Sequence, residues 1–382
     1  MATPRFALVA GEASGDQLAA GLIQALRERY PEAEFEGVTG PRMEQAGCHS
    51  LASISELSLF GIGEVIGEIP RLLALRRRLY RHFRERRPDV FIGIDAPAFN
   101  TGLERRLKRS GIITVHYVCP TIWAWREGRV HSIRRAVDRL LAIFPFEPAL
   151  FERHGIDARY IGHPLADELR QAPDQSSARR TFGLDTRGPW VGLLPGSRHS
   201  EVTRLGPRFL NTAAWLKRRM PEVRFIAPMA TPAIYSQFEQ MLAAHPDAPP
   251  VKLVDGHARE AMCAADVLLL ASGTATLEAL LLRTPMVVAY AVSGANHALA
   301  RVLRLLKTDY VSMPNLLAGR ELVPELLQSA AEPRTMGSLL HHLLTSADAR
   351  LAQTTAFDAI HERLALGANQ RAAAAVAELV PA

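Results

Sequence analysis

The feature that most constrains the fold is a repeated alternation of short apolar segments with longer amphipathic ones. Strand-like runs occupy residues 6–10, 34–38, 90–94, 112–117, 140–143 and 158–161, and a second series occupies 190–194, 224–227, 251–254, 267–270 and 285–290. Helical periodicity is clear in residues 16–30, 71–86, 207–220, 275–282 and 338–344. Strands that alternate with helices form parallel sheets with helices on both faces. The sequence therefore predicts an α/β fold.

The alternation stops and restarts, which predicts two domains. A polar stretch at residues 171–180 separates the two series, and 382 residues exceed what one ordinary core requires. We expect an N-terminal domain over residues 1–170, a C-terminal domain over 171–347, and a helical segment over 348–382 that packs back on the N-terminal domain. Two doubly wound domains facing each other would place the strand ends, and hence the ligands, in the cleft between them.

Composition narrows the class of protein. Hydrophobic residues make up 48% of the chain, which is enough for globular cores. The three cysteines, Cys48, Cys119 and Cys263, are widely spaced and form no CxxC pair, as is typical of a reduced cytoplasmic compartment. We expect neither a signal peptide nor a transmembrane helix. The net charge of +6 is compatible with phosphate-rich ligands, nucleic acid or an anionic membrane.

Two loops in the second half each follow an apolar strand and lead into a helix. Their candidate ligand-binding residues are Gly196, Ser197 and Arg198 in the first loop and Ser272, Gly273, Thr274, Thr276 and Glu278 in the second. Small residues let backbone N–H groups approach a phosphate, and an arginine fork neutralises a pyrophosphate. The pair predicts a nucleotide diphosphate site that requires no metal and no cofactor. Ordinary turns are the alternative for either loop alone, and Glu201 is a candidate helix cap.

A third loop in this half contains Asn315 and Arg320. Both side chains could reach the nucleotide or the cleft between the domains, and turn capping is the alternative.

An aspartate in the first half directly follows a strand. Asp95 ends the run 90–94, where an open α/β sheet exposes side chains to ligands. Deprotonating a sugar hydroxyl requires a positioned carboxylate or imidazole, so Asp95 is the candidate general base. Capping of the next helix is the alternative.

Two further strand ends carry candidate acceptor-site residues. Glu12 and Ser14 follow the first strand, where Glu12 would repel a pyrophosphate and so indicates a different ligand. His116 and Trp123 lie at and after the strand 112–117, where they could line a sugar or acyl pocket. Helix capping by Ser14 or Asp16 and aromatic packing are the alternatives.

An apolar and cationic patch lies within the first strand series, between the runs 34–38 and 90–94. Its candidate membrane-facing residues are Ile62, Val65, Ile66, Leu72, Leu75 and Arg76. An apolar helix face rimmed by arginines can lie in a membrane interface, with its cations on anionic headgroups. The alternative is an amphipathic helix packed on its own sheet.

Seven motifs resemble those of the lipid-A-disaccharide synthase family, in the family's order and over nearly the whole chain. They are GEASGD, GVTGPRM, GIDAPAFN, HYVCPTIWAWR, LLPGSR, LLASGTATLE and KTDYVSMPNLLAGREL. The resemblance implies a GT-B fold of two Rossmann-like domains. It also implies an inverting transfer from UDP-2,3-diacylglucosamine to 2,3-diacylglucosamine 1-phosphate (lipid X), giving a β-1,6-linked disaccharide 1-phosphate and UDP.

The resemblance also implies residue roles and a location. Asp95 matches the family's proposed base and Arg198 its diphosphate-binding arginine, while Glu278 sits where such folds hold the ribose. Glu12 and Asn315 fall at motif positions that we expect in the cleft. The implied location is peripheral, on the cytoplasmic face of the inner membrane of Gram-negative bacteria, and a homo-oligomer is compatible with the sequence.

One motif departs from the family pattern. The family reads Asp-Ala-Pro-Asp-Phe-Asn where this chain has Ala98 in place of the second aspartate. A chain that relied on that second carboxylate as its base would be impaired. Because Asp95 lies directly at the strand end, we interpret Ala98 as a tolerated change.

Other functions fit the sequence less well. A lipid II-forming transferase would carry a GGSxG loop near the first strand, where this chain has GEASGD, and a UDP-GlcNAc 2-epimerase would need no lipid acceptor surface. A non-catalytic binding protein would not need both Asp95 and Arg198. Nucleic-acid binding is disfavoured because the arginines alternate with Leu and Phe, and a dehydrogenase because a GxGxxG fingerprint is missing.

Overall fold

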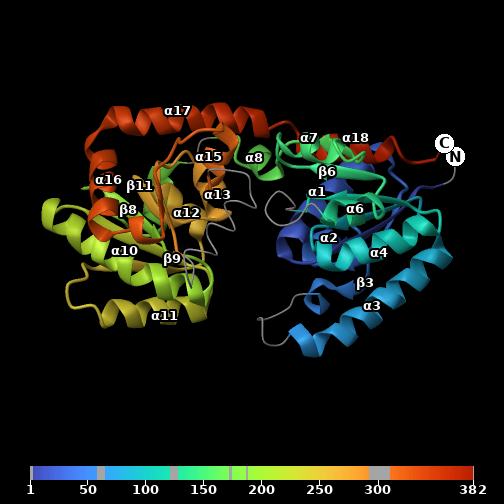
Figure 1. The fold of residues 1–382 in the computed structure, drawn as a ribbon, viewed down its shortest axis with the longest axis horizontal. Coiled ribbons are helices and arrows are strands. Elements are labelled where there is room, and N and C mark those ends of the chain that lie inside the picture. The colour runs from blue at the N-terminus through green and yellow to red at the C-terminus, as the bar shows by residue number, and fades with distance from the viewer. Residues whose placement is uncertain are drawn as a thin grey trace. The chain divides into compact units, whose positions relative to one another are not determined.

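The chain forms two compact units in the computed structural model, which describes residues 3–57, 65–120, 128–171, 174–185, 188–291 and 310–381 (Figure 1). Unit 1 comprises Met1–Asp167 and Arg363–Ala382, and unit 2 comprises Glu168–Glu362. The expected boundary at residue 170 lies close to the division after Asp167. The expected C-terminal segment differs, because only the part from Arg363 onward joins unit 1 rather than all of 348–382.

Unit 1 is built on a seven-stranded parallel sheet in the order β3-β2-β1-β4-β5-β6-β7. The strands are β1 (Arg5–Ala10), β2 (Glu34–Thr39), β3 (His49–Ser53), β4 (Val90–Ile94), β5 (Ile113–Tyr117), β6 (Arg139–Ala142) and β7 (Asp157–Tyr160). The predicted alternation is confirmed for this unit. Strand β3 was not predicted because its sequence, HSLAS, is mostly polar and lies at the exposed edge of the sheet.

Helices cover both faces of this sheet. They are α1 (Ala13–Arg29), α2 (Pro41–Gln45), α3 (Val65–Arg86), α4 (Pro97–Arg109), α6 (Gly128–Arg134), α7 (Glu147–Glu152), α8 (Pro164–Glu168) and α18 (Ala368–Ala377). Successive β1 side chains point to opposite faces of the sheet. Phe6 and Leu8 pack beneath α1 and α18, whereas Ala7 and Val9 pack beneath α3 and α4. This is the period-2 alternation of a strand buried on both sides.

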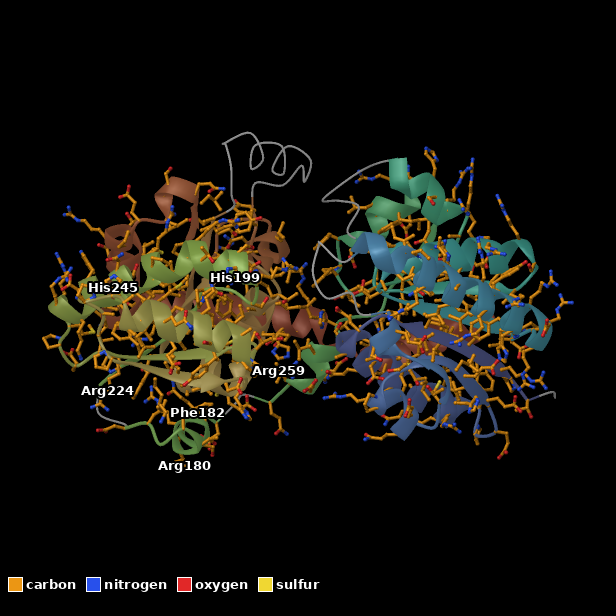
Figure 2. The ribbon with its side chains drawn as sticks, turned by 90° about the horizontal axis from the view of Figure 1, so that it is seen from below. Arg180, Phe182, His199, Arg224, His245 and Arg259 are labelled. Carbon is orange, nitrogen blue, oxygen red and sulfur yellow. The ribbon has the colours of Figure 1, made fainter. Side chains whose placement is uncertain are left out.

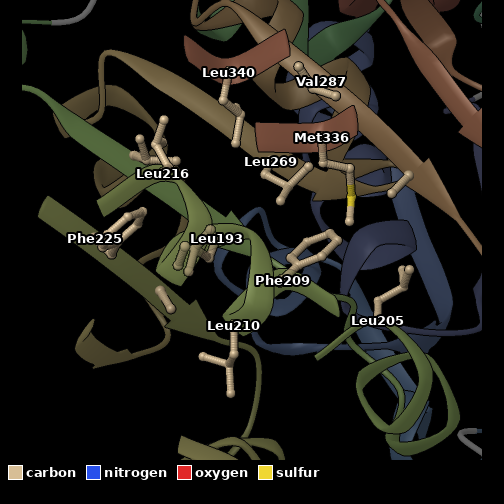
Figure 3. Packing of buried hydrophobic residues seen from close by; sticks show 14 of the residues in the cluster. Leu193, Leu205, Phe209, Leu210, Leu216, Phe225, Leu269, Val287, Met336 and Leu340 are labelled. Atoms are coloured by element: carbon tan, nitrogen blue, oxygen red, sulfur yellow. The ribbon is translucent and has the colours of Figure 1, made fainter. Parts of the chain in front are cut away.

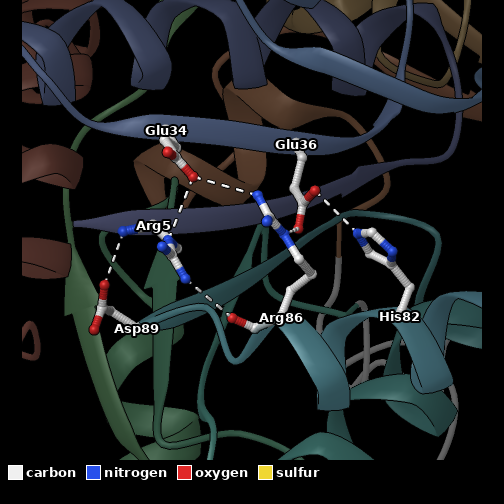
Figure 4. A network of polar contacts seen from close by, with 6 residues as sticks. All are labelled: Arg5, Glu34, Glu36, His82, Arg86 and Asp89. Atoms are coloured by element: carbon white, nitrogen blue, oxygen red, sulfur yellow. Dashed lines mark hydrogen bonds and ion pairs between the residues drawn. The ribbon is translucent and has the colours of Figure 1, made fainter. Parts of the chain in front are cut away.

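Helix α3 is fixed to the sheet by apolar contacts and by a polar network. Leu79 and Phe83 are fully buried against the face that contains Phe91. At the carboxyl end of the helix, His82 contacts Glu36 at 2.9 Å and Arg86 contacts Glu34 at 3.4 Å (Figure 4). No helix among the described residues is long and apolar enough to cross a membrane.

These contacts correct part of the predicted membrane patch. Leu75 is only 5% exposed and belongs to the core, and Leu72 packs against the same cluster. Arg76 lies against α4, where burial and then Arg106, Arg105 and Arg77 lower its pKa. The apolar face of this helix therefore packs on the sheet of its own unit, as the alternative interpretation proposed. Ile62 and the side chains of Val65 and Ile66 lie outside the described residues.

Unit 2 is built on a six-stranded parallel sheet in the order β10-β9-β8-β11-β12-β13. The strands are β8 (Trp190–Leu194), β9 (Arg224–Met229), β10 (Val251–Asp255), β11 (Val267–Ala271), β12 (Met286–Tyr290) and β13 (Glu325–Leu327). The helices are α9 (Gln175–Thr181), α10 (His199–Arg219), α11 (Pro232–Ala243), α12 (Ala258–Ala264), α13 (Ala275–Leu281), α15 (Met313–Ala318), α16 (Pro333–Thr345) and α17 (Ala347–Leu364). The second predicted series is confirmed, with β13 as an unpredicted addition.

The main core of unit 2 lies between this sheet and helices α10 and α16. Figure 3 shows Leu193 and Leu269 from the central strands beside Phe209 of α10 and Met336 of α16, all buried. Helix α17 is joined to β12 by Gln353, which accepts a hydrogen bond from the Met286 backbone N–H at 2.8 Å. This bond is one reason why most of α17 stays with unit 2.

Replacing a core aromatic should destabilise unit 2 selectively. We expect Phe209→Ala to lower the free energy of unfolding by roughly 3–5 kcal/mol, because the side chain is fully buried and its loss leaves a cavity. Urea titration followed by Trp fluorescence measures this. The control Leu351→Ala, at a side chain that is 63% exposed, should change the free energy by less than about 0.5 kcal/mol. Equal effects of the two substitutions would contradict the packing.

Candidate active site

Parallel pairing brings the candidate loops of unit 1 together. Ala10 at the end of β1 pairs with Ile94 at the end of β4, and Ile94 pairs with Tyr117 at the end of β5. Because the carboxyl ends of parallel strands meet at one edge, the loops that carry Glu12 and Asp95 emerge side by side.

Asp95 occupies a strained backbone position at this edge. Asp95 and Ala96 have φ values of 48° and 43°, in the left-handed region that residues other than glycine rarely adopt. The Asp95 N–H donates to the Tyr117 carbonyl at 2.9 Å, and the Asn100 amide donates to the Asp95 carbonyl at 2.8 Å. Such strain persists only where neighbours enforce it, and it is concentrated at functional sites.

The surroundings of Asp95 suit a general base. Its pKa is raised, first by burial and then by the like charge of Glu12, while the Ala96 backbone N–H and the His116 imidazole offset part of the rise. A carboxylate with a raised pKa accepts a proton more readily near neutral pH. The capping alternative is not observed, because Ala96 is the N-cap of α4 and no side chain caps that helix. Ala98 is exposed on the first helical turn.

The other predicted residues of unit 1 have different surroundings. Glu12 and Ser14 are exposed, and the Ser14 hydroxyl donates to Glu12 Oε1 at 2.5 Å. Asp16 does not cap α1, because its buried carboxylate accepts N–H bonds at the start of α2, including that of Met43 at 2.9 Å. The prediction that His116 lines an acceptor pocket is wrong, because this residue is only 1% exposed and lies beneath the surface. Trp123 lies outside the described residues.

The two candidate loops of unit 2 border one cavity. Leu194 of β8 pairs with Leu270 of β11, so the loops that follow these strands are adjacent. A cavity of about 180 Å³ is lined by residues from both loops and from β12, including Arg198, Glu201, Arg204, Ser272 and Tyr290. Arg204 and Tyr290, which the sequence analysis did not single out, both contribute to its wall.

The first loop is organised around Glu201. Its carboxylate accepts the Ser197 N–H at 3.1 Å and lies 3.3 Å from the Arg198 guanidinium, as predicted for a helix cap. Gly196 has φ of 134°, and a Cβ there would lie 2.5 Å from the Glu201 side chain, so only glycine lets the loop close around this acid. The Arg198 side chain remains 81% exposed and can turn to a ligand.

The second loop offers fewer free donors than expected. Thr276 is fully buried, and its hydroxyl donates to the Gly273 carbonyl at 2.7 Å and accepts the Met313 N–H at 3.1 Å. The prediction that Thr276 contacts a phosphate directly is therefore wrong. The Ser272 hydroxyl donates to the Val311 carbonyl at 2.7 Å, whereas Gly273 and Thr274 are exposed.

Glu278 is already near a cation. Arg259 of α12, labelled in Figure 2, lies 3.7 Å from its carboxylate and 3.0 Å from that of Glu168. Burial raises the pKa of Glu278, Arg259 lowers it in part, and Glu168 raises it further. The carboxylate remains 27% exposed, so its proposed contact with a ribose stays a prediction.

Asn315 is a structural residue rather than a nucleotide ligand. It is fully buried, and its amide donates to the Val323 carbonyl at 2.9 Å and to Glu325 at 2.8 Å. Its carbonyl accepts the N–H groups of Leu322 at 2.7 Å and Val323 at 2.9 Å. All of its hydrogen-bonding capacity is used, so the alternative of turn capping is confirmed.

Comparison with known proteins identifies the family. The profile described as "Lipid-A-disaccharide synthetase" matches residues 6–379. The chain belongs to the lipid-A-disaccharide synthase family. It is 51% identical to the lipid-A-disaccharide synthase of Pseudomonas paraeruginosa over 98% of each chain. It is 49% identical to that of Chromohalobacter salexigens over 98% of this chain and 97% of the relative.

Solved structures are similar in fold at low sequence identity. The UDP-GlcNAc 2-epimerase of Neisseria meningitidis bound to UDP-GlcNAc superposes with a TM-score of 0.61 at 13% identity, over 98% of this chain and 99% of the other. The glycotransferase of kitacinnamycin superposes with a TM-score of 0.63 at 16% identity over the whole of both chains. The predicted class, an α/β fold with two Rossmann-like parallel-sheet domains of the GT-B type, is confirmed.

Removing the Asn315 side chain should affect stability rather than nucleotide affinity. We expect Asn315→Ala to destabilise unit 2 by roughly 1–3 kcal/mol, because it leaves the Leu322 and Val323 N–H groups without their acceptor. Thermal melting and UDP titration of the folded variant measure the two effects. The control is Glu321→Ala at an exposed position in the same loop. Lost UDP affinity at unchanged stability would restore Asn315 as a ligand.

Proposed function

We propose that the protein joins two acylated glucosamines, transferring the sugar of UDP-2,3-diacylglucosamine to 2,3-diacylglucosamine 1-phosphate. The observation that carries this assignment, in a chain of this family, is the cavity of unit 2 that Arg198 and Ser272 border together. An arginine fork beside small residues matches a nucleotide diphosphate in charge and shape.

The reaction is a single displacement at the anomeric carbon. The acceptor 6-hydroxyl oxygen forms a bond to C1 as the bond from C1 to the diphosphate oxygen breaks, which inverts the configuration. Asp95 takes the hydroxyl proton, and its raised pKa supports that role. The departing UDP carries the new negative charge, which Arg198 stabilises. To bind the diphosphate, Arg198 exchanges its contact with Glu201 for one with the ligand.

Contact with an anionic membrane surface is the second part of the proposal. The acyl chains of both substrates place them in a bilayer, so the protein acts peripherally, at the cytoplasmic face of the inner membrane. With Leu75, Leu79 and Phe83 buried, the outer face of α3 presents exposed arginines and Ile69, which is 45% exposed. Arginines near a surface of anionic lipid each contribute about 1 kcal/mol.

Replacing either Asp95 or Arg198 should abolish most of the activity. We expect Asp95→Asn to lower kcat by roughly 10²–10⁴-fold and Arg198→Ala to lower it about a hundredfold. UDP release and disaccharide formation are measured with and without EDTA, and EDTA should have no effect because Arg198 neutralises the diphosphate. The matched control is Asp255→Asn, an exposed aspartate that also ends a strand.

The outcomes separate the parts of the assignment. An active Asp95→Asn variant would leave the family assignment intact but would rule out Asp95 as the general base. No disaccharide from the wild type would favour another sugar-nucleotide reaction, such as epimerisation.

Membrane binding should depend on the exposed arginines of α3. We expect Arg77→Gln combined with Arg81→Gln to weaken sedimentation with vesicles containing phosphatidylglycerol by on the order of tenfold. The control pair Arg218→Gln with Arg334→Gln removes the same charge from exposed positions of unit 2. Equal losses from both pairs would show that net charge, rather than this helix, attracts the membrane.

A further inference from the structure

A carboxylate lies on the wall of the unit 2 cavity that is assigned to the diphosphate. Glu201, in the first turn of α10, lines this cavity together with Arg198, Arg204 and Ser272. A diphosphate is itself multiply anionic, so an acid beside it opposes its binding by like-charge repulsion. The sequence analysis treats Glu201 only as a candidate helix cap, and capping alone does not explain why its carboxylate borders a site for an anion.

The two oxygens of this carboxylate have different partners. Glu201 Oε2 accepts the Ser197 N–H at 3.1 Å and the Arg198 N–H at 3.4 Å, which closes the loop onto the helix. Glu201 Oε1 accepts a bond from Arg198 Nη1 at 3.3 Å. The backbone N–H groups need only an acceptor oxygen, whereas the guanidinium is attracted by the negative charge. One oxygen therefore organises the loop, and the other holds the arginine that is proposed to bind the ligand.

The charge of Glu201 acts inside the cavity. Tyr290 of β12 borders the same space, and its pKa is raised first by burial and then by Glu201, whereas Arg198 and Arg204 lower it. Arg204 makes no ion pair among the described residues, so Arg198 is the cavity arginine that an internal acid holds. An incoming diphosphate must compete with Glu201 for Arg198 but not for Arg204.

The two partners differ in their freedom to move. The Arg198 side chain is 81% exposed, and an exposed guanidinium exchanges one anion for another at little cost. The acid is fixed more tightly, because its Oε2 is bonded to the loop. Gly196 permits this close approach, since a Cβ there would lie 2.6 Å from Glu201 Oε2. Arg198 can therefore turn to a ligand while the negative charge of Glu201 stays beside the site.

We propose that Glu201 is an internal competitor of the diphosphate for the Arg198 guanidinium, so that it weakens UDP binding and speeds the release of this product. The proposal rests on the nucleotide site assigned above. Glu201 Oε2 anchors the carboxylate, and Oε1 takes up Arg198 as the departing diphosphate gives it up. Glu201 acts through Arg198 and is a positioning residue. A site that only attracted the diphosphate would retain UDP after each turnover and so slow the next one.

Replacing Glu201 by glutamine separates its two roles. The amide oxygen still accepts the loop N–H groups, but the side chain no longer carries the charge that holds Arg198. We expect Glu201→Gln to lower the Kd for UDP about fivefold and to slow UDP dissociation by a similar factor, which is the size of an exposed ion pair. Isothermal titration calorimetry and stopped-flow displacement measure the two quantities. A purely structural role predicts unchanged or weaker binding instead.

Matched variants identify the contested arginine. Arg198→Gln and Arg204→Gln should each weaken UDP binding. Only Arg198→Gln should also cancel most of the gain from Glu201→Gln, because coupling is confined to the side chain that Glu201 contacts. The control Glu239→Gln removes the same charge from an exposed position of α11 and should leave the Kd unchanged.

Thermal melting shows whether the loop is intact. Glu201→Gln should melt at the temperature of the wild type. Glu201→Ala, which also loses the loop bonds, should melt at a lower temperature.

Two results would overturn the proposal: UDP binding that is unchanged or weaker in folded Glu201→Gln, or an equal gain in affinity when Arg198 is also replaced. These titrations use UDP alone and require no acylated sugar. A wild type that binds UDP but forms no disaccharide would therefore reject the assigned reaction and leave the competition in place.

Discussion

Parallel pairing of two central strands in each unit is the constraint on which the candidate sites depend. In unit 1, Ala10 pairs with Ile94, and in unit 2, Leu194 pairs with Leu270. Each pairing brings two loops, distant in sequence, out at the same edge of a sheet. A slip by one residue would turn every side chain of a strand to the opposite face and separate the loops from their helices. The buried apolar faces on both sides of each sheet prevent such a slip.

Three charged or polar groups in and near the candidate sites have an internal partner. Glu201 lies beside Arg198, Arg259 beside Glu278, and Glu104 beside His116. The first two pairs are partly exposed, so a ligand can replace the internal partner at modest cost. The third is fully buried, where separation of the partners would leave an uncompensated charge. The surface pairs are thus suited to binding, and the buried pair, which joins α4 to β5, is suited to a structural role.

Helix α3 illustrates how one sequence pattern is compatible with two functions. An apolar stripe rimmed by arginines is typical of both a membrane-surface helix and a helix packed on a sheet. The sheet face that contains Phe91 requires a cover, and Leu79 and Phe83 supply it. Only the arginines that point away from the sheet remain for an anionic surface.

The sequence by itself determined the two α/β units, most of their strands and the family, because periodicity and loop motifs are local properties of the chain. It also located Asp95 and Arg198 at strand ends. Tertiary structure decided which polar residues are available, since burial and hydrogen-bond partners come from segments far away in the chain. Asn315 and Thr276 look like ligands in sequence, yet Val323 and Met313 occupy their polar atoms. Tyr290 became part of the site only because the sheet places the end of β12 beside the loops that follow β8 and β11, and a contact between elements has no signature within either one.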